Sequence, residues 1–214
     1  MKKLIALLLV LLCLMPCACA VASKYEPITL TVEEAAAANL FLSNFTETGV
    51  RNVGWKSQDI DLVDFAHDHM WFNSRDRFEF GEYFNGNNCR VSDEKIQEII
   101  DKYFWDPWQV DLSETRYDYR DGYYYGCETG GFTPMGFAHV VSVVPCDTYG
   151  EQAYLMTFLV YGIGDGWDSS VYSMTQEAIE AEYADFAPGC GSALVSASDL
   201  SDRSTYRMMS YSRH

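Results

Sequence analysis

The sequence "GFAHVVSVVPCDTYGEQAYLMTFLVY", residues 136–161, determines the architecture that we expect for this chain. It consists of two runs of β-branched and aromatic residues joined by "PCDTYG", residues 145–150, which is typical of a β-hairpin. Alternation in the first run places Phe137, Val141 and Val143 on one side, and Ala138, Val140 and Val144 on the other. Because both sides are apolar, we expect this hairpin to be central in a sheet that is covered on both faces.

The patterns around this hairpin indicate the fold class. Thr31 and Glu34 have the spacing of a capping box, which predicts a helix start. Apolar periodicity predicts helices within residues 28–45, 59–72, 91–105 and 174–186, and strands within 115–127 and 204–212. Asp121 and Gly122 predict the turn of a second hairpin. We therefore expect a single α+β domain over residues 23–214, in which N-terminal helices pack on a mostly antiparallel sheet of about five strands, the C-terminal strand included.

The first residues predict export. Lys2 and Lys3 precede an apolar run from Ile5 to Met15, and the small residues "ACAVAS" follow. This order resembles a bacterial export signal, and the resemblance covers residues 1–22. It implies an exported protein that is either released after cleavage or anchored to the outer surface of the cytoplasmic membrane by lipid on Cys17 or Cys19.

Charge and composition limit the partners. The formal net charge is −16, and 48% of the residues are hydrophobic. Such an apolar content predicts a packed core rather than disorder. A strongly acidic surface repels phosphates, so we expect no nucleic-acid partner and no membrane contact except through a lipid anchor. The same charge is also what a solvated, soluble surface requires.

Four cysteines follow the export signal: Cys89, Cys127, Cys146 and Cys190. An even number in an exported chain permits two disulfides, for which three connectivities are possible, but spacing alone does not choose between disulfides and free thiols. No two of them have the Cys-x-x-Cys spacing of a zinc ribbon or a thioredoxin motif.

Cys127 and His139 are the residues of a possible thiol active site. A histidine within hydrogen-bond reach activates a cysteine as a nucleophile. However, Cys127 ends a predicted strand and is followed by a glycine-rich turn, whereas His139 alternates in phase with Phe137 and Val141. We therefore interpret both as members of a sheet, and a secreted Cys/His hydrolase remains the alternative.

Asp64, His67 and Asp68 share one face of the predicted helix within residues 59–72, where they could bind a divalent cation. Ordinary surface residues fit the same pattern, and His69 belongs instead to the apolar stripe. The glycine-rich stretch "GIGDGW" lacks the lysine of a phosphate-binding loop. The sequence thus favours neither a metal nor another cofactor.

Aromatic residues are concentrated in one part of the chain: Trp105, Trp108, Tyr119, Tyr123, Tyr124 and Tyr125. Consecutive tyrosines in a strand expose rings on both faces, and rings with polar tips suit a protein, peptide or carbohydrate ligand. The alternative is a sheet face packed under the helices. We therefore favour a non-catalytic binding domain at or outside the bacterial cell envelope.

Overall fold

The computed structural model describes residues 26–54, 57–105, 109–126, 136–162, 167–186 and 188–214. The predicted export signal with Cys17 and Cys19 lies outside these ranges, as do Trp108 and Cys127.

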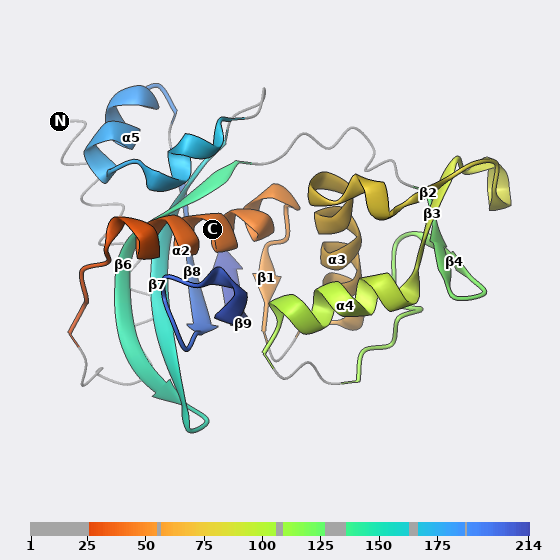
Figure 1. Cartoon of the computed structure of the whole chain (residues 1–214), viewed down its shortest axis with the longest axis horizontal. Coiled ribbons are helices and arrows are strands. Elements are labelled where there is room, and N and C mark those ends of the chain that lie inside the picture. Colours follow the sequence, from red (N-terminus) through yellow and green to blue (C-terminus); the bar gives the residue numbers. More distant parts are fainter. Residues whose placement is uncertain (1–25, 55–56, 106–108, 127–135, 163–166, 187) are drawn as a thin grey trace.

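The described residues form an α+β fold, as predicted (Figure 1). The helices are α2 (Val32–Glu47), α3 (Asp59–Asn73), α4 (Asp93–Tyr103) and α5 (Gln176–Glu182). The strands are β1 (Asn52–Val53), β2 (Glu79–Phe80), β3 (Cys89–Ser92), β4 (Asp118–Arg120), β5 (Tyr123–Tyr125), β6 (Phe137–Thr148), β7 (Glu151–Tyr161), β8 (Gly189–Ser196) and β9 (Arg207–Arg213).

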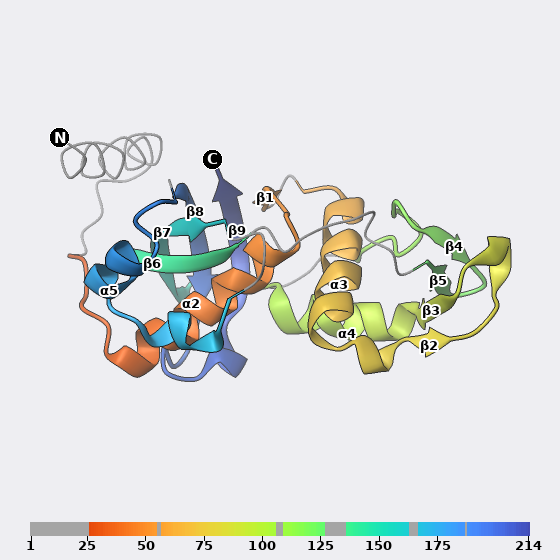
Figure 2. The same cartoon turned by 90° about the horizontal axis from the view of Figure 1, so that it is seen from above.

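The strands form two antiparallel sheets rather than one. The large sheet has the order β1-β9-β8-β7-β6, and the small sheet has the order β2-β3-β5-β4. Helices α2 and α5 lie with the large sheet, whereas α3 and α4 lie with the small sheet (Figure 1). Seen from above, α3 stands between the two sheets (Figure 2). We call these two parts the large-sheet half and the small-sheet half.

The central hairpin is longer and less regular than predicted. Strand β6 continues through Pro145 and Cys146, and the turn is confined to Tyr149 and Gly150, which have φ angles of 54° and 82°. A bulge between Val140 and Ser142 shifts the register of β6. After the bulge Val143 packs in the same core as Ala138, so the prediction that Val143 shares a side with Phe137 was wrong.

Both faces of the large sheet are nevertheless covered by apolar residues. One face belongs to the main core, to which α2 contributes Phe41, Leu42 and Phe45. On the other face, Phe137 and Tyr161 form a smaller cluster with Ile179 of α5 and Val171 of the short 3-10 helix η4 (Ser169–Ser173). The prediction of a doubly covered hairpin is therefore confirmed.

Polar residues of α2 cover the free edge of β6, which is the last strand of the large sheet. The amide oxygen of Asn39 accepts a hydrogen bond from the Val140 N–H at 2.7 Å, and the Ser43 hydroxyl accepts one from the Ala138 N–H at 2.9 Å. The Thr46 hydroxyl donates to the carbonyl of Gly136 at 2.6 Å. An unpaired edge exposes backbone groups to other chains, and α2 satisfies them instead.

The structure distinguishes the cysteines by their bonding state. Cys89 in β3 and Cys190 in β8 are each disulfide-bonded. Cys146 is a free thiol, and its cross-strand neighbour in the central hairpin is Ala153. The sequence left disulfides and free thiols open for these cysteines; the structure shows Cys89 and Cys190 in disulfides and Cys146 as a thiol, and Cys127 is not among the described residues.

We predict that Asn39→Ala lowers the free energy of unfolding by about 2–4 kcal/mol. The substitution leaves the Val140 N–H and the Tyr172 carbonyl, both bonded to Asn39, without that partner, and each unsatisfied buried group costs about 1–3 kcal/mol. Urea denaturation measures the change, with Gln97→Ala on the exposed side of α4 as the control. A loss below about 0.5 kcal/mol for Asn39→Ala would show that water replaces these bonds without cost.

Candidate functional site

His139 is a buried member of the large sheet, as predicted. It lies in β6 with its Nδ1 atom 3.4 Å from the side-chain nitrogen of Asn39, and 5% of its surface is exposed. Burial lowers the pKa of the imidazole, which is opposed by Glu180, so the neutral form is favoured. Its distance to Cys127 lies outside what the structure describes, so the hydrolase alternative gains no support from His139.

The aromatic residues that the sequence suggested as one surface lie in three separate parts of the structure. Tyr124 is fully buried, and its hydroxyl donates to the Leu112 carbonyl at 2.6 Å. Tyr119, in contact with Tyr124, donates to Asp93 at 2.9 Å. Both side chains pack with the core, so an exposed role for Tyr124 was a wrong expectation. Alternation along β5 accounts for this, because Tyr124 faces the helices whereas Tyr123 and Tyr125 face the other side. On that side Tyr123 is half-buried, and Tyr125 is buried beside Phe84 and Tyr83.

Trp105 is far from these tyrosines. Its ring stacks on Tyr149 of the β6–β7 turn, with 5.4 Å between the ring centres. Its indole N–H donates to Glu151 at 2.6 Å. Trp105 therefore belongs to the large-sheet half and not to a shared surface with Tyr123.

Tyr123 and Tyr125 lie on the other face of the small sheet, together with residues that sequence reasoning missed. The β4–β5 and β3–β5 pairings place Arg90 opposite Tyr125 and Arg120 opposite Tyr123. The β2–β3 connection adds two rings. We call this group the outer face; it consists of Tyr83, Phe84, Arg90, Arg120, Tyr123 and Tyr125.

Guanidinium groups lie against the rings of the outer face. The Arg90 guanidinium is 4.1 Å from the ring centre of Tyr123 and 4.7 Å from that of Tyr83. Glu79 fixes it by accepting a hydrogen bond from Nε at 2.8 Å. Arg120 lies 4.9 Å from the ring centre of Phe84. Cation–π contacts of this kind hold both partners in defined orientations.

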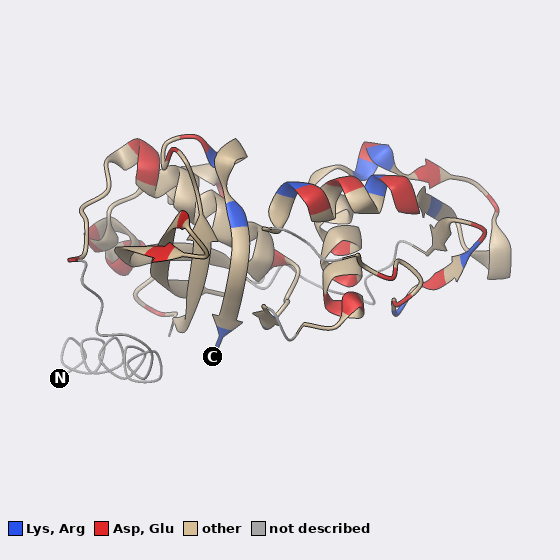
Figure 3. Cartoon of the chain, turned by 90° about the horizontal axis from the view of Figure 1, so that it is seen from below, with Lys and Arg blue, Asp and Glu red and all other residues tan. Residues whose placement is uncertain are grey.

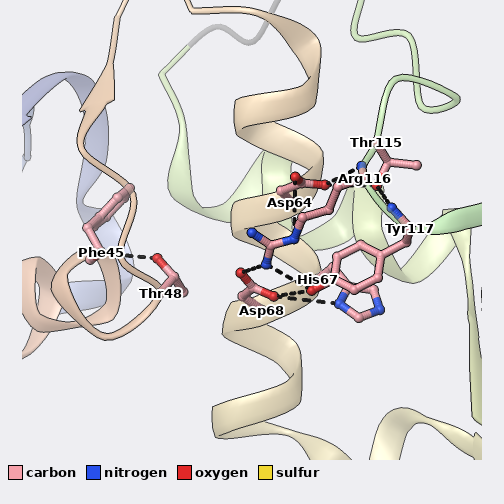
Figure 4. Close-up of polar contacts among 8 residues, drawn as sticks. All are labelled: Phe45, Thr48, Asp64, His67, Asp68, Thr115, Arg116 and Tyr117. Atoms are coloured by element: carbon pink, nitrogen blue, oxygen red, sulfur yellow. Dashed lines mark hydrogen bonds and ion pairs between the residues drawn. The ribbon is translucent and has the colours of Figure 1, made fainter. Parts of the chain in front are cut away.

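Asp64 and Asp68 form a second polar group, on α3 (Figure 4). Asp68 accepts hydrogen bonds from the Arg116 guanidinium and from the Tyr117 hydroxyl. Asp64 accepts from the Thr115 hydroxyl at 2.8 Å and from the Arg116 backbone N–H at 3.2 Å. Burial raises the pKa of Asp64, and these two hydrogen bonds oppose that rise.

These contacts correct the interpretation of Asp64, His67 and Asp68 as ordinary surface residues. Asp68 is 2% exposed and His67 is fully buried. The possible metal role is not supported either, because the carboxylates accept bonds from Arg116, Tyr117 and Thr115. Among the residues that the structure describes, no group of three or more histidine, cysteine or acidic side chains is arranged to hold a metal ion.

His67 lies behind this carboxylate pair. Its ring stacks on Tyr117 with 3.6 Å between centres, and its Nδ1 atom is 3.9 Å from Asp68. Neither ring nitrogen has a hydrogen-bond partner among the described residues. Burial lowers the pKa of His67, and the neighbouring Asp68 only partly opposes this, so the neutral imidazole is favoured.

A cleft of about 510 Å³ opens beside Asp64 and Asp68. One wall is α3, and the facing wall is the connection from α2 to β1, residues 48–52. Arg116 also lines it. The cleft therefore lies where the large-sheet half meets the small-sheet half.

No protein-family model, curated protein or solved structure matches this chain. None of the helices in the described ranges is both long and apolar enough to span a bilayer. The chemistry of the outer face and of the cleft is therefore the basis for assigning a function.

We predict that His67→Phe makes the protein less sensitive to acid. An unfolded histidine gains a proton near pH 6.5, whereas the folded His67 has a lowered pKa. The lowered pKa therefore contributes its full stability above about pH 6.5, the unfolded value. Between that pH and the folded pKa, the free energy of unfolding decreases by about 1.4 kcal/mol for each pH unit of acidification. Phenylalanine does not titrate, so urea denaturation should show a smaller loss between pH 7.5 and pH 5.5 in the variant.

The comparison between two pH values removes any packing cost of the larger ring, since that cost is the same at both. His214→Phe, at the exposed C-terminal residue, is the control and should leave the pH dependence unchanged. Equal losses for the wild type and His67→Phe would mean that His67 has the same pKa in the folded and unfolded states, which contradicts the effect of its burial.

Proposed function

We propose that this protein is an exported, non-catalytic binding domain that acts at or outside the bacterial cell envelope, and that its outer face contacts a protein or peptide. The observation that carries this proposal is the set of rings and guanidinium groups held together on the open face of the small sheet.

The composition of the outer face favours a protein or peptide. Tyrosine, phenylalanine and arginine are the residue types enriched at the energetic centres of protein interfaces. A carbohydrate stacks on a free ring face, but guanidinium groups already occupy a face of Tyr83, Phe84 and Tyr123. Ring edges, hydroxyls and guanidinium N–H groups remain for a partner.

The outer face is also preorganised. Arg90 is fixed by Glu79, and Asn85 and Asn87 of the β2–β3 connection donate to Asp118 of β4 at 3.1 and 3.3 Å. These bonds hold Phe84 over Tyr125, with 5.7 Å between ring centres. A surface that is ordered before binding loses little conformational entropy when a partner docks.

Disulfide bonding supports the export part of the proposal. Cys89 and Cys190 are disulfide-bonded, and such bonds persist in oxidising compartments outside the cytoplasm. The export signal at residues 1–22 points in the same direction. Removal of this signal, or lipid attachment at Cys17 or Cys19, is compatible with a binding role at the envelope.

We predict that a photoreactive residue at position 123 captures the partner. Tyr123 is replaced by p-benzoyl-phenylalanine, and irradiation of cells that export the protein should yield one discrete crosslinked protein or peptide. Phe186, 42% exposed in the large-sheet half, carries the same probe as the control and should not give this product. Adding Phe84→Ala and Arg120→Ala should lower the affinity for the captured partner about tenfold or more, because interface anchors contribute more than 1 kcal/mol each.

Two outcomes would contradict the proposal. A product of equal yield from positions 123 and 186, or no product from either, would mean that the outer face is not a docking surface. Retention of the wild type on purified cell-wall sacculi, abolished by Phe84→Ala together with Arg120→Ala, would identify a carbohydrate ligand instead of a protein.

A further inference from the structure

The cleft between the two halves contains charged groups whose hydrogen-bonding capacity is only partly used by the fold. Arg51 is exposed and makes no side-chain ion pair or hydrogen bond within the described ranges. One carboxylate oxygen of Asp61 accepts the Gln58 backbone N–H at 3.1 Å, which leaves the other oxygen for a ligand. Arg116 bonds Asp68 and Tyr117 through Nη2, and its Nε lies 3.7 Å from Asp64, so Nη1 remains available for a ligand.

We propose that this cleft binds a small zwitterion, a molecule that carries both an ammonium and a carboxylate, such as a free amino acid or a dipeptide. Arg51 and Arg116 bind the carboxylate, and Asp61 and Asp64 bind the ammonium. This site is separate from the outer face and does not depend on the function proposed for it.

Both walls of the cleft carry charged groups, and Arg116 lies among the carboxylates of α3. Asp61 and Asp64 are three residues apart on α3, so they lie on the same side of the helix along the cleft. Arg51 lies on the facing wall, in the connection between α2 and β1. Figure 4 shows the Arg116 guanidinium between Asp64 and Asp68, with one nitrogen directed toward the side on which Thr48 lies.

The balance of charge excludes simpler ligands. The lining contains the acidic residues Asp61, Asp64 and Asp68 and the basic residues Arg51 and Arg116. The carboxylates of α3 would repel a simple anion in the cleft, and the two guanidinium groups would repel a simple cation. A zwitterion satisfies both signs at once.

Rigidity and size also fit a small ligand. Asp68 is almost fully buried and holds Arg116 in place, while Thr115 and the Arg116 backbone hold Asp64. A volume of about 510 Å³ is sufficient for an amino acid or a dipeptide and falls within the range of small-ligand pockets. The negative field of the whole chain, with acidic residues over both halves (Figure 3), attracts the ammonium end first.

Isothermal titration calorimetry of the purified mature protein tests this proposal with the L-amino acids and with dipeptides built from them as probes. We expect saturable binding of at least one probe. For that probe, the C-terminal amide and the N-acetyl derivative, which each lack one charge, should bind at least about tenfold more weakly, because a charge-assisted hydrogen bond contributes about 1.5–3 kcal/mol.

Variants locate the site. Arg51→Ala and Asp61→Asn should each weaken the same probe by about ten- to one-hundred-fold, and both should fold, since asparagine keeps an oxygen for the Gln58 N–H. Arg75→Ala, at an exposed arginine just after α3 that belongs neither to the cleft nor to the outer face, is the matched control and should bind like the wild type. Unchanged melting temperatures of the unliganded variants exclude a folding defect.

Failure of every probe to bind overturns the proposal, as does binding that Arg51→Ala and Asp61→Asn leave unchanged. Equal affinity for a probe and its N-acetyl derivative would identify an anion site in place of a zwitterion site. None of these results affects the crosslinking outcome at Tyr123, so the proposals for the cleft and for the outer face are tested independently.

Discussion

The ring of Phe45 connects the two halves of the molecule. It is fully buried near the end of α2 and stacks on Phe65 of α3 at 4.5 Å between centres and on Tyr211 of β9 at 5.5 Å. Phe104, just after α4, meets it edge to face at 5.9 Å. One side chain therefore contacts the large sheet and both helices of the small-sheet half. Aromatic contacts of this kind add to the free energy of burying the ring itself.

The position of Phe45 also determines the cleft. Helix α2 ends at Thr48, whose hydroxyl donates a hydrogen bond to the Phe45 carbonyl at 3.0 Å (Figure 4). The residues that follow Thr48, including Arg51, form one wall of the cleft. The opposite wall of the cleft is helix α3, which carries Asp61 and Asp64. The same helix carries Phe65, the ring that stacks on Phe45. Because the same contact holds both walls, the charged groups of the cleft keep a defined separation.

Local signals in the sequence predicted the elements that are stabilised locally. The Thr31–Glu34 capping box begins α2, with both reciprocal hydrogen bonds present. The turn at Asp121 and Gly122 has the positive φ angles, 52° and 78°, that these residue types tolerate. Strands β1, β2 and β3 were missed because they have only two to four residues each and depend on partners distant in the chain. Strand β8 was also missed, although it has eight residues, because its first half, "GCGS", contains no β-branched or aromatic residue.

The candidate sites were harder to predict for the same reason. Periodicity assigns polar residues to the outside of a helix, but Asp68 is buried because Arg116, 48 residues away, pairs with it. Consecutive tyrosines implied that the two faces of β5 differ. The residue that contacts Tyr123, however, is Arg90, and it lies on the neighbouring strand β3. Sequence spacing alone therefore reveals neither the Arg116–Asp68 pair nor the Arg90–Tyr123 contact. The signal that could have directed attention to them is the presence of arginines in an otherwise acidic chain.

Native-state hydrogen exchange of the wild type and Phe45→Ala tests most directly whether this ring joins the halves. The account predicts that amide protection in β3 and in β8 falls together, by about 3–5 kcal/mol, because truncating a buried phenylalanine removes packing from both halves at once. Loss of protection in β3 alone, or in β8 alone, would contradict the account and would mean that each half is stable without the other.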